Sequence, residues 1–199
     1  MLRKIYVLSL FVLIVSVVTS CSPTQKKRDV FSLPENWLNN ELPESDLLMS
    51  FPNTWNNIVG IDQPYIYILS GDNFVKGMCG LVSNIFGKEF KDEFINLKSD
   101  DDRLSSLLST FSFDNFAYYE DRSAYYEVCS QNIAYIVEYS VKEESEGDII
   151  DKLDAFVVTP NNEVIFCNTV TTIDDYWQVD QSTILEIFGS IRSSEGGGN

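Results

Sequence analysis

The chain has 199 residues, of which 44% are hydrophobic and 13% aromatic, and this composition is typical of one folded domain rather than a disordered chain. Its formal net charge of −16 opposes contact with phosphate backbones, which excludes nucleic acid as a partner. It contains no histidine, which excludes Ser-His-Asp and Cys-His catalysis and His-ligated zinc, so we expect no enzyme and no cofactor or metal.

The first 20 residues have the pattern of an export signal. Arg3 and Lys4 precede an apolar run over 5–18, which is too short to span a bilayer. The run ends in Val-Thr-Ser-Cys at 18–21, which resembles the lipobox of bacterial lipoproteins. The resemblance implies cleavage before Cys21 and a diacylglyceryl thioether on its sulfur, commonly with acylation, such as palmitate, of the new amine. An ordinary secretory signal with an incidental cysteine, or an uncleaved anchor, is the alternative.

The lipobox-like pattern sets expectations for the location of the protein. Lipidation of Cys21 predicts a protein of the cell envelope whose first partner is the membrane itself. By resemblance to the sorting rule of enteric bacteria, Ser22 favours the outer membrane if the host has one. Residues 21–33 are interpreted as the lipidated cysteine and a flexible tether, with a basic cluster at 26–28 that suits anionic headgroups. The mature chain would carry a net charge of −18.

Three further cysteines, Cys79, Cys129 and Cys167, are scattered along the chain without a C-x-x-C motif. In an oxidising compartment one pair can form a disulfide and leave one thiol over, and the spacing leaves all three pairings open. Three buried thiols are the alternative, because unpaired cysteine is commonly buried.

The folded domain is predicted over 34–192, with a frayed tail over 193–199. Its first half has strands at 47–52 and 65–69, separated by a Pro-Trp turn at 52–55 and followed by a turn cluster at 70–73. Residues 74–90 are ambiguous, because glycines oppose the helix that Leu81, Val82 and Ile85 would otherwise indicate. An acidic start and an apolar stripe predict a helix over 101–111.

The second half is rich in β-strand patterns. Strands are predicted at 116–119, 125–129 and 133–141, and a hairpin joins 154–158 to 164–173 through a turn at 160–162. The last strand is apolar on both faces and therefore needs cover on both faces. A helix over 181–192, with Asp180 as its N-cap, places its apolar stripe on one side. The stripe consists of Ile184, Ile187, Phe188 and Ile191.

These elements predict an α+β fold, an antiparallel sheet flanked by helices. Three features carry a family resemblance: the Phe51-Pro52 pair followed by Trp55, the hairpin at 161–162, and the closing Phe-Gly-Ser-Ile-Arg at 188–192. Over residues 45–192 this order resembles PsbP-like domains, a family that includes a photosystem II extrinsic protein, a Ran-binding group and many bacterial lipoproteins. The resemblance implies an α/β/α sandwich with a non-catalytic binding or assembly role, and transfers no catalytic residue.

Four clusters of side chains are candidate sites. Asp100, Asp101 and Asp102 suit a helix start better than a calcium site, and the acids of 143–148 suit a solvated hairpin tip. Asp174 and Asp175 would be the candidates of a glycoside hydrolase, although adjacent acids are more often a helix cap. The tyrosines fit either a recognition surface or alternating strand burial. They are Tyr118, Tyr119, Tyr125 and Tyr126.

Three functions are compatible with these features. The favoured one is a lipid-anchored, non-catalytic binding or assembly domain with an unidentified protein partner. The alternative is an acidic inhibitor or immunity-type lipoprotein that neutralises a basic secreted toxin, because the chain is strongly acidic. The third is a carboxylate-dependent hydrolase that uses Asp174 or Asp175.

Overall fold

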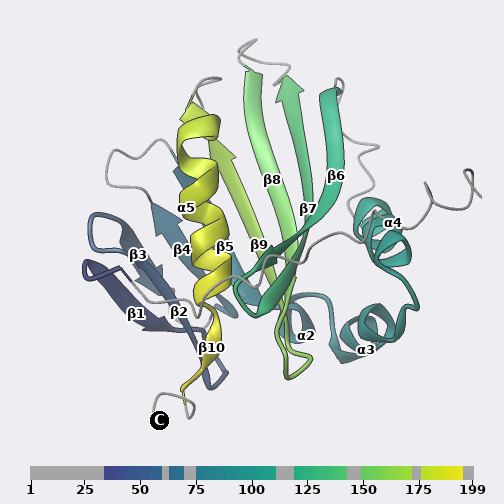
Figure 1. Cartoon of the computed structure of the whole chain (residues 1–199), viewed down its shortest axis with the longest axis horizontal. Helices are drawn as coiled ribbons and strands as arrows, with labels where there is room; N and C mark the ends of the chain where they lie inside the picture. The colour runs from purple at the N-terminus through teal and green to yellow at the C-terminus, as the bar shows by residue number, and fades with distance from the viewer. Residues whose placement is uncertain are drawn as a thin grey trace, which may run out of the picture.

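The computed structural model describes residues 34–59, 63–69, 75–110, 119–142, 149–171 and 176–194 (Figure 1). These residues form a large and a small antiparallel sheet with helices on both sides. Within the same ranges no helix has the length and apolarity needed to cross a membrane.

The large sheet consists of two antiparallel meanders that meet in its interior. The first meander precedes the helices of one face and the second follows them, and the two join where β5 pairs with β9. In spatial order the strands are β3 (Asn56–Val59), β4 (Tyr65–Leu69), β5 (Val75–Leu81), β9 (Val164–Thr171), β8 (Ile149–Val158), β7 (Asn132–Lys142) and β6 (Tyr119–Cys129).

A disulfide joins Cys79 to Cys167 at the junction of the two meanders. The two residues are direct register partners on β5 and β9, with their Cα atoms 4.3 Å apart, so the strand pairing itself brings the sulfurs together. Both side chains are buried. Cys129, at the end of β6, is a buried thiol outside this disulfide.

The small sheet combines both ends of the described chain. Strand β2 (Leu47–Pro52) pairs with β1 (Trp37–Glu41) on one side and with β10 (Arg192–Ser193) on the other. The Arg192 guanidinium donates to the hydroxyl of Ser50 at 3.1 Å and to the side-chain oxygen of Asn39 at 2.7 Å. The backbone N–H of Ser50 in turn donates to the hydroxyl of Ser190.

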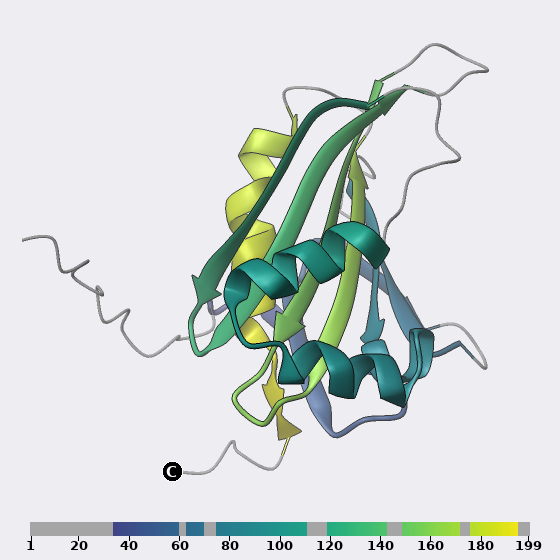
Figure 2. The same cartoon turned by 90° about the vertical axis from the view of Figure 1, so that its right-hand side faces the viewer.

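Helices cover the large sheet from both sides, as Figure 2 shows. Helices α2 (Val82–Ile85), α3 (Lys88–Asn96) and α4 (Asp100–Thr110) lie on one face, and α5 (Tyr176–Ser190) lies on the other together with the small sheet. The predicted fold class, an antiparallel sheet flanked by helices, is confirmed.

The face under α5 holds the first part of the core. The predicted stripe of Ile184, Ile187, Phe188 and Ile191 is buried against inward side chains of β2, β4, β7, β8 and β9. The end of α5 is fixed by Asn132, a buried side chain whose amide donates to the carbonyls of Phe188 and Ile191 at 2.8 and 3.0 Å.

The opposite face is packed with aromatic rings. Phe86, Phe90 and Phe94 project from the α2–α3 segment onto Phe156 of β8, with ring centroids 5.0 to 5.8 Å from that of Phe156. Such edge-to-face pairs are favourable beyond the area that they bury. Both faces of β9 are therefore covered, as its sequence predicts.

Arg103 holds α3 and α4 together. Its guanidinium donates to the backbone carbonyls of Ile95 and Leu97 at 3.1 and 2.8 Å, near the end of α3, where carbonyls lack helical partners. It also lies 3.2 Å from the carboxylate of Asp100, which accepts a hydrogen bond from the hydroxyl of Tyr135.

Many predicted elements are confirmed. The strands at 47–52 and 65–69 have the predicted bounds, and the turn between Pro52 and Trp55 is closed by a 2.9 Å backbone hydrogen bond. The predicted helix at 101–111 is α4, shifted by one residue, and the hairpin is formed by β8 and β9. Strand 133–141 is β7, in which Ala134 and Ile136 at even positions are buried as well as Tyr135, Val137 and Tyr139 at odd positions.

Other predictions were wrong in part. Asp180 lies inside α5, which begins at Tyr176 and ends at Ser190, so it is not the N-cap. Ser193 belongs to β10 rather than to the tail. In place of two strands at 116–119 and 125–129, the structure has one strand, β6, that begins at Tyr119. Residues 116–118 lie outside the described residues. The same holds for the turn cluster at 70–73, the charged segment at 143–148 and the tail over 195–199.

The ambiguous segment 74–90 contains strand β5 and helix α2. Two of its glycines, both on β5, mark close contacts with neighbouring backbone. A Cβ on Gly77 would lie 2.5 Å from the carbonyl oxygen of Asn168. A Cβ on Gly80 would lie equally close to the carbonyl oxygen of Pro64. Side chains are therefore excluded at both positions of this strand.

Candidate functional site

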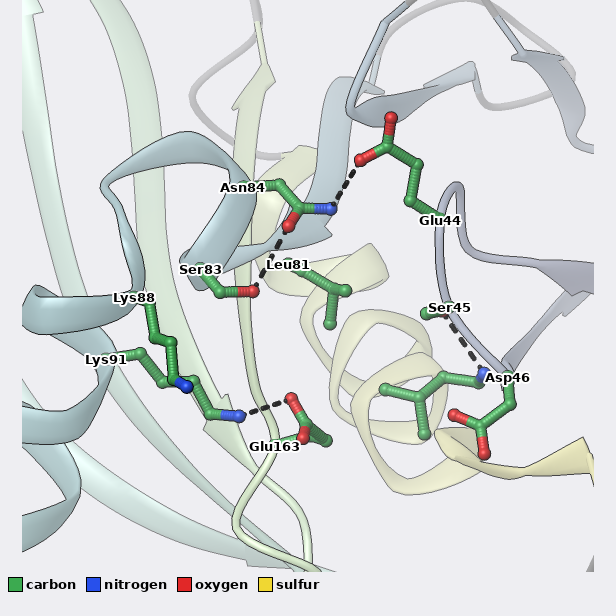
Figure 3. Close-up of a pocket in the computed structure, with 10 residues that line it drawn as sticks. Glu44, Ser45, Asp46, Leu81, Ser83, Asn84, Lys88, Lys91 and Glu163 are labelled. Atoms are coloured by element: carbon green, nitrogen blue, oxygen red, sulfur yellow. Dashed lines mark hydrogen bonds and ion pairs between the residues drawn. The ribbon is translucent and has the colours of Figure 1, made fainter.

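A pocket of about 440 Å³ opens where three distant segments meet (Figure 3). They are the β1–β2 loop, the segment from the end of β5 to α3, and the β8–β9 turn. Its volume lies within the range of small-ligand sites. The lining residues are Glu44, Ser45, Asp46, Leu47, Leu81, Ser83, Asn84, Lys88, Lys91 and Glu163.

One wall of the pocket carries both of its lysines. Gly87 has a φ of 97°, a conformation that suits glycine, and it turns the chain from α2 into α3. Lys88 and Lys91 follow at the start of α3, three residues apart and therefore on one side of the helix. The ammonium of Lys91 forms a 2.7 Å ion pair with Glu163, whereas Lys88 is exposed and has no ion-pair partner among the described residues.

The β8–β9 turn fixes the position of Glu163. Its backbone N–H donates to the hydroxyl of Thr159 at 3.1 Å, and its carbonyl accepts from the backbone N–H of Thr159 at 2.9 Å. Asn162 has a φ of 60°, a left-handed conformation that asparagine tolerates well. The turn therefore presents the Glu163 carboxylate to Lys91 from a fixed backbone.

The opposite wall is the acidic β1–β2 loop. The loop is closed by the backbone N–H of Leu42, which donates to the carbonyl of Leu47 at 2.9 Å, and by the hydroxyl of Ser45, which donates to the Leu42 carbonyl. Glu44 accepts a 3.1 Å hydrogen bond from the side-chain amide of Asn84, which links this loop to α2. Asp46 is exposed at the rim, and Figure 3 shows Glu44 and Asp46 across the pocket from the two lysines.

The surface between the walls is apolar. Leu47 and Leu81 line the pocket and belong to the core under α5. The pocket therefore has oppositely charged walls on either side of an apolar floor that the fold itself holds in place.

Tyr125 and Tyr135, two tyrosines outside the pocket, have raised pKa values and form hydrogen bonds between elements of the fold. Tyr125 donates a 2.5 Å hydrogen bond to Glu138, and Gln181 of α5 donates to both groups. Burial, and then the bond to Glu138, raises the pKa of Tyr125. Burial, and then the bond to Asp100, raises the pKa of Tyr135 to about 12.

Asp154 is a carboxylate buried inside the large sheet. It accepts hydrogen bonds from the hydroxyl of Tyr139, at 2.7 Å, and from the side-chain amide of Asn168. Burial raises the pKa of this carboxyl above its ordinary value of 3.8, against the opposing effects of these bonds and of Lys152. The charge is therefore held at a cost to the stability of the fold.

We expect the free energy of unfolding of Asp154→Asn to fall less with rising pH than that of wild type. Above pH 3.8 the unfolded chain releases this proton first, while the folded chain holds it up to the raised pKa. The folded state binds more protons in this window, so the free energy of unfolding falls as pH rises. An asparagine has no such slope and can keep hydrogen bonds with Tyr139 and a rotated Asn168.

The measurement is urea unfolding at several pH values from 3.5 upward, with Asp92→Asn, an exposed position on α3, as the matched control. The difference between Asp154→Asn and wild type should grow in favour of the variant with pH, and by more than in the control. A difference that stays constant with pH would contradict the prediction.

The structure places some of the sequence-predicted residues. Asp100, Asp101 and Asp102 form the first turn of α4, so the predicted acidic helix start is confirmed. No group of three potential metal ligands occurs in the ranges that the structure describes. Tyr126 is exposed on β6, while Tyr125 is braced against α5.

Other predicted residues lie outside the described ranges. They are Cys21, Asp174, Asp175, Tyr118 and the acids of 143–148, and the side chain of Tyr119 is likewise not described. The pocket residues are not predictable from the sequence, because they come from three segments whose proximity no local pattern reveals. The one available signal is the pair of lysines at 88 and 91 in a strongly acidic chain.

No protein-family model and no curated protein sequence matches this chain. Among solved structures, it is similar to the Ran-binding protein Mog1p of Saccharomyces cerevisiae, with a TM-score of 0.51 and 6% identity over 80% of this chain and 96% of that one. The chain shares the fold of Mog1p. This likeness fits the resemblance to PsbP-like domains, whose family includes a Ran-binding group.

Two more distant likenesses were found beside Mog1p. LpqN of Mycobacterium tuberculosis, described as involved in cell envelope biogenesis, has a TM-score of 0.43 and 12% identity over 73% of this chain and 81% of its own. CyanoP, the PsbP protein of Synechocystis sp. PCC 6803, has a TM-score of 0.42 and 13% identity over 82% of this chain and 98% of its own.

Proposed function

We propose that this protein is a lipid-anchored lipoprotein of the cell envelope whose folded domain binds another protein without catalysis. The observation that carries the binding role is the pocket, in which the apolar Leu81 lies between a wall with lysines and an acidic loop. The fold shared with a Ran-binding protein is consistent with a binding role.

The disulfide supports a location outside the cytoplasm. Disulfides persist in oxidising compartments and are rare in the cytosol. The Cys79–Cys167 bond is therefore a second argument for export, independent of the lipobox-like pattern at 18–21. Anchoring through Cys21 and placement in the outer membrane belong to this proposal.

The anchor is tested by Cys21→Ser. Without the thiol there is no site for the thioether, so we expect labelled palmitate to be incorporated by wild type and reduced to background in the variant. The protein should also shift from the membrane fraction to the soluble fraction, because two acyl chains account for stable anchoring. Ser22→Ala, which keeps the cysteine, is the matched control and should label like wild type. Equal labelling of wild type and Cys21→Ser would refute the anchor.

The binding role is tested with the full lipidated chain, cross-linked in membranes and purified in mild detergent. We expect a protein partner to be recovered in a fixed ratio to the bait. Recovery of none under these conditions would count against the proposed binding role.

The second candidate is an acidic inhibitor or immunity-type lipoprotein that neutralises a basic secreted toxin. The net charge favours it, −16 for the full chain and −18 once residues 1–20 with Arg3 and Lys4 are removed, because such a field accelerates encounter with a cationic protein. Its partner would be basic and its association rate would fall steeply with salt. Partner binding that does not respond to salt would exclude it.

A further inference from the structure

We propose that the pocket recognises a segment of the partner protein in which an apolar side chain lies between a basic and an acidic one. This inference rests on the proposed binding function and names the ligand of the same pocket. The occupant is inferred from the order of charge and apolar surface across the pocket.

The lysine wall provides one net positive charge. The ion pair with Glu163 neutralises Lys91, and the partial burial of both groups makes this pair a fixed part of the wall. Lys88 lies one helical turn away, exposed and with no ion-pair partner among the described residues. It is the cation available to a carboxylate on a ligand.

The loop wall provides negative charge. Glu44 forms no ion pair with a described residue. Its carboxylate accepts a hydrogen bond from the side-chain amide of Asn84, which is neutral, so its negative charge is not compensated. Asp46 at the rim is exposed, and its side chain has no hydrogen bond to a described residue. A lysine or arginine on a ligand would be attracted to both carboxylates.

The apolar floor sets the spacing between the two charges. Leu81 lies between the walls, and Leu47 lines the pocket beside Asp46. Both are buried, with 3% and 6% of their surface exposed for Leu47 and Leu81, so the part that a ligand can touch favours a small apolar group. A basic residue, an apolar residue and an acidic residue in close sequence satisfy all three surfaces. The net charge of −16 adds a long-range attraction for a segment that lies in a basic region of its partner.

The test uses fluorescein-labelled heptapeptides and the full lipidated chain in detergent micelles. The probe peptide has the centre Lys-Leu-Glu within Gly and Ser flanks. Two further peptides replace its lysine or its glutamate by glutamine, and a fourth replaces both. Because exposed ion pairs are weak, we expect each replacement to weaken binding about three- to five-fold at low salt.

Variants of the protein show which wall of the pocket contacts which charged residue of the peptide. Lys88→Glu should weaken the Lys-Leu-Glu peptide about three- to five-fold or more and should not weaken the peptide that lacks glutamate. Asp46→Lys should likewise weaken binding of the Lys-Leu-Glu peptide and should not weaken binding of the peptide that lacks lysine. Lys98→Glu, which reverses an exposed lysine outside the pocket, is the matched control and should leave all affinities unchanged.

Either of two results with the peptides overturns the inference. In one, the Lys-Leu-Glu peptide binds no better than the doubly replaced peptide. In the other, Lys88→Glu weakens the peptides with and without glutamate equally. A cross-linked partner that Lys88→Glu still retains in full would leave the proposed function in place and refute the pocket as its recognition site.

Discussion

Replacement of Phe156 by alanine is expected to lower the free energy of unfolding by about 3–5 kcal/mol. Phe156 is fully buried at the centre of the large sheet, and its ring contacts Phe86, Phe90 and Phe94 of the α2–α3 segment. Alanine would leave a cavity under this segment that the surrounding sheet cannot close. Because α2 and α3 also form one side of the pocket, the same change should loosen the lysine wall.

The measurement is equilibrium unfolding in urea, followed by circular dichroism. Phe156→Leu keeps most of the buried volume and should cost clearly less, so it keeps the prediction testable if the alanine variant does not fold. Leu38→Ala removes an apolar side chain that is 57% exposed and should change stability by less than about 0.5 kcal/mol. A Phe156→Ala variant as stable as Leu38→Ala would contradict the packing described above.

The disulfide is expected to have a similar effect. Joint replacement of Cys79 and Cys167 by alanine should lower the free energy of unfolding by about 2–5 kcal/mol. The bond closes a sequence separation of 88 residues, so it restricts the unfolded chain strongly. It also links the two meanders at the one strand pair that connects them in the large sheet.

The comparison is urea unfolding of wild type and the double variant, each with and without a reductant. Reductant should lower the stability of wild type to about that of the double variant and should leave the double variant unchanged. Cys129→Ala removes a buried thiol without removing a cross-link and is the matched control, with an expected loss of about 1 kcal/mol. A wild type that is insensitive to reductant under unfolding conditions would contradict the prediction.

Much of the fold was predictable because its signals are local. The β8–β9 hairpin, strand β7 and the stripe of α5 each follow from a periodic pattern within one segment. Strand β5 was not predictable in this way, since Gly77 and Gly80 reflect contacts with Asn168 and Pro64 rather than any local preference. Helix α5 begins before Asp180, because the N-cap preference of one residue, about 1 kcal/mol, is too small to decide by itself where a helix starts.

The pocket depends on contacts that the sequence does not display. Glu44 and Asn84 are 40 residues apart, and Lys91 and Glu163 are 72 apart, yet each pair is in hydrogen-bond contact. Glu44 itself has a φ of 56°, which no residue type in that loop would have predicted. Only the tertiary arrangement of the sheets brings these segments together. The sequence therefore shows that these charged residues exist but does not show that they form one site.

The small sheet has a consequence for how the protein is made. The backbone N–H of Ser50 donates to the hydroxyl of Ser190, 140 residues later in the sequence. The second partner strand of β2 is β10, which is the last strand of the described chain. Nearly the whole domain must be synthesised before this contact can form, because Ser190 lies close to the end of the described chain. A nascent polypeptide therefore keeps β2 without one of its two partner strands until the residues of β10 have left the ribosome.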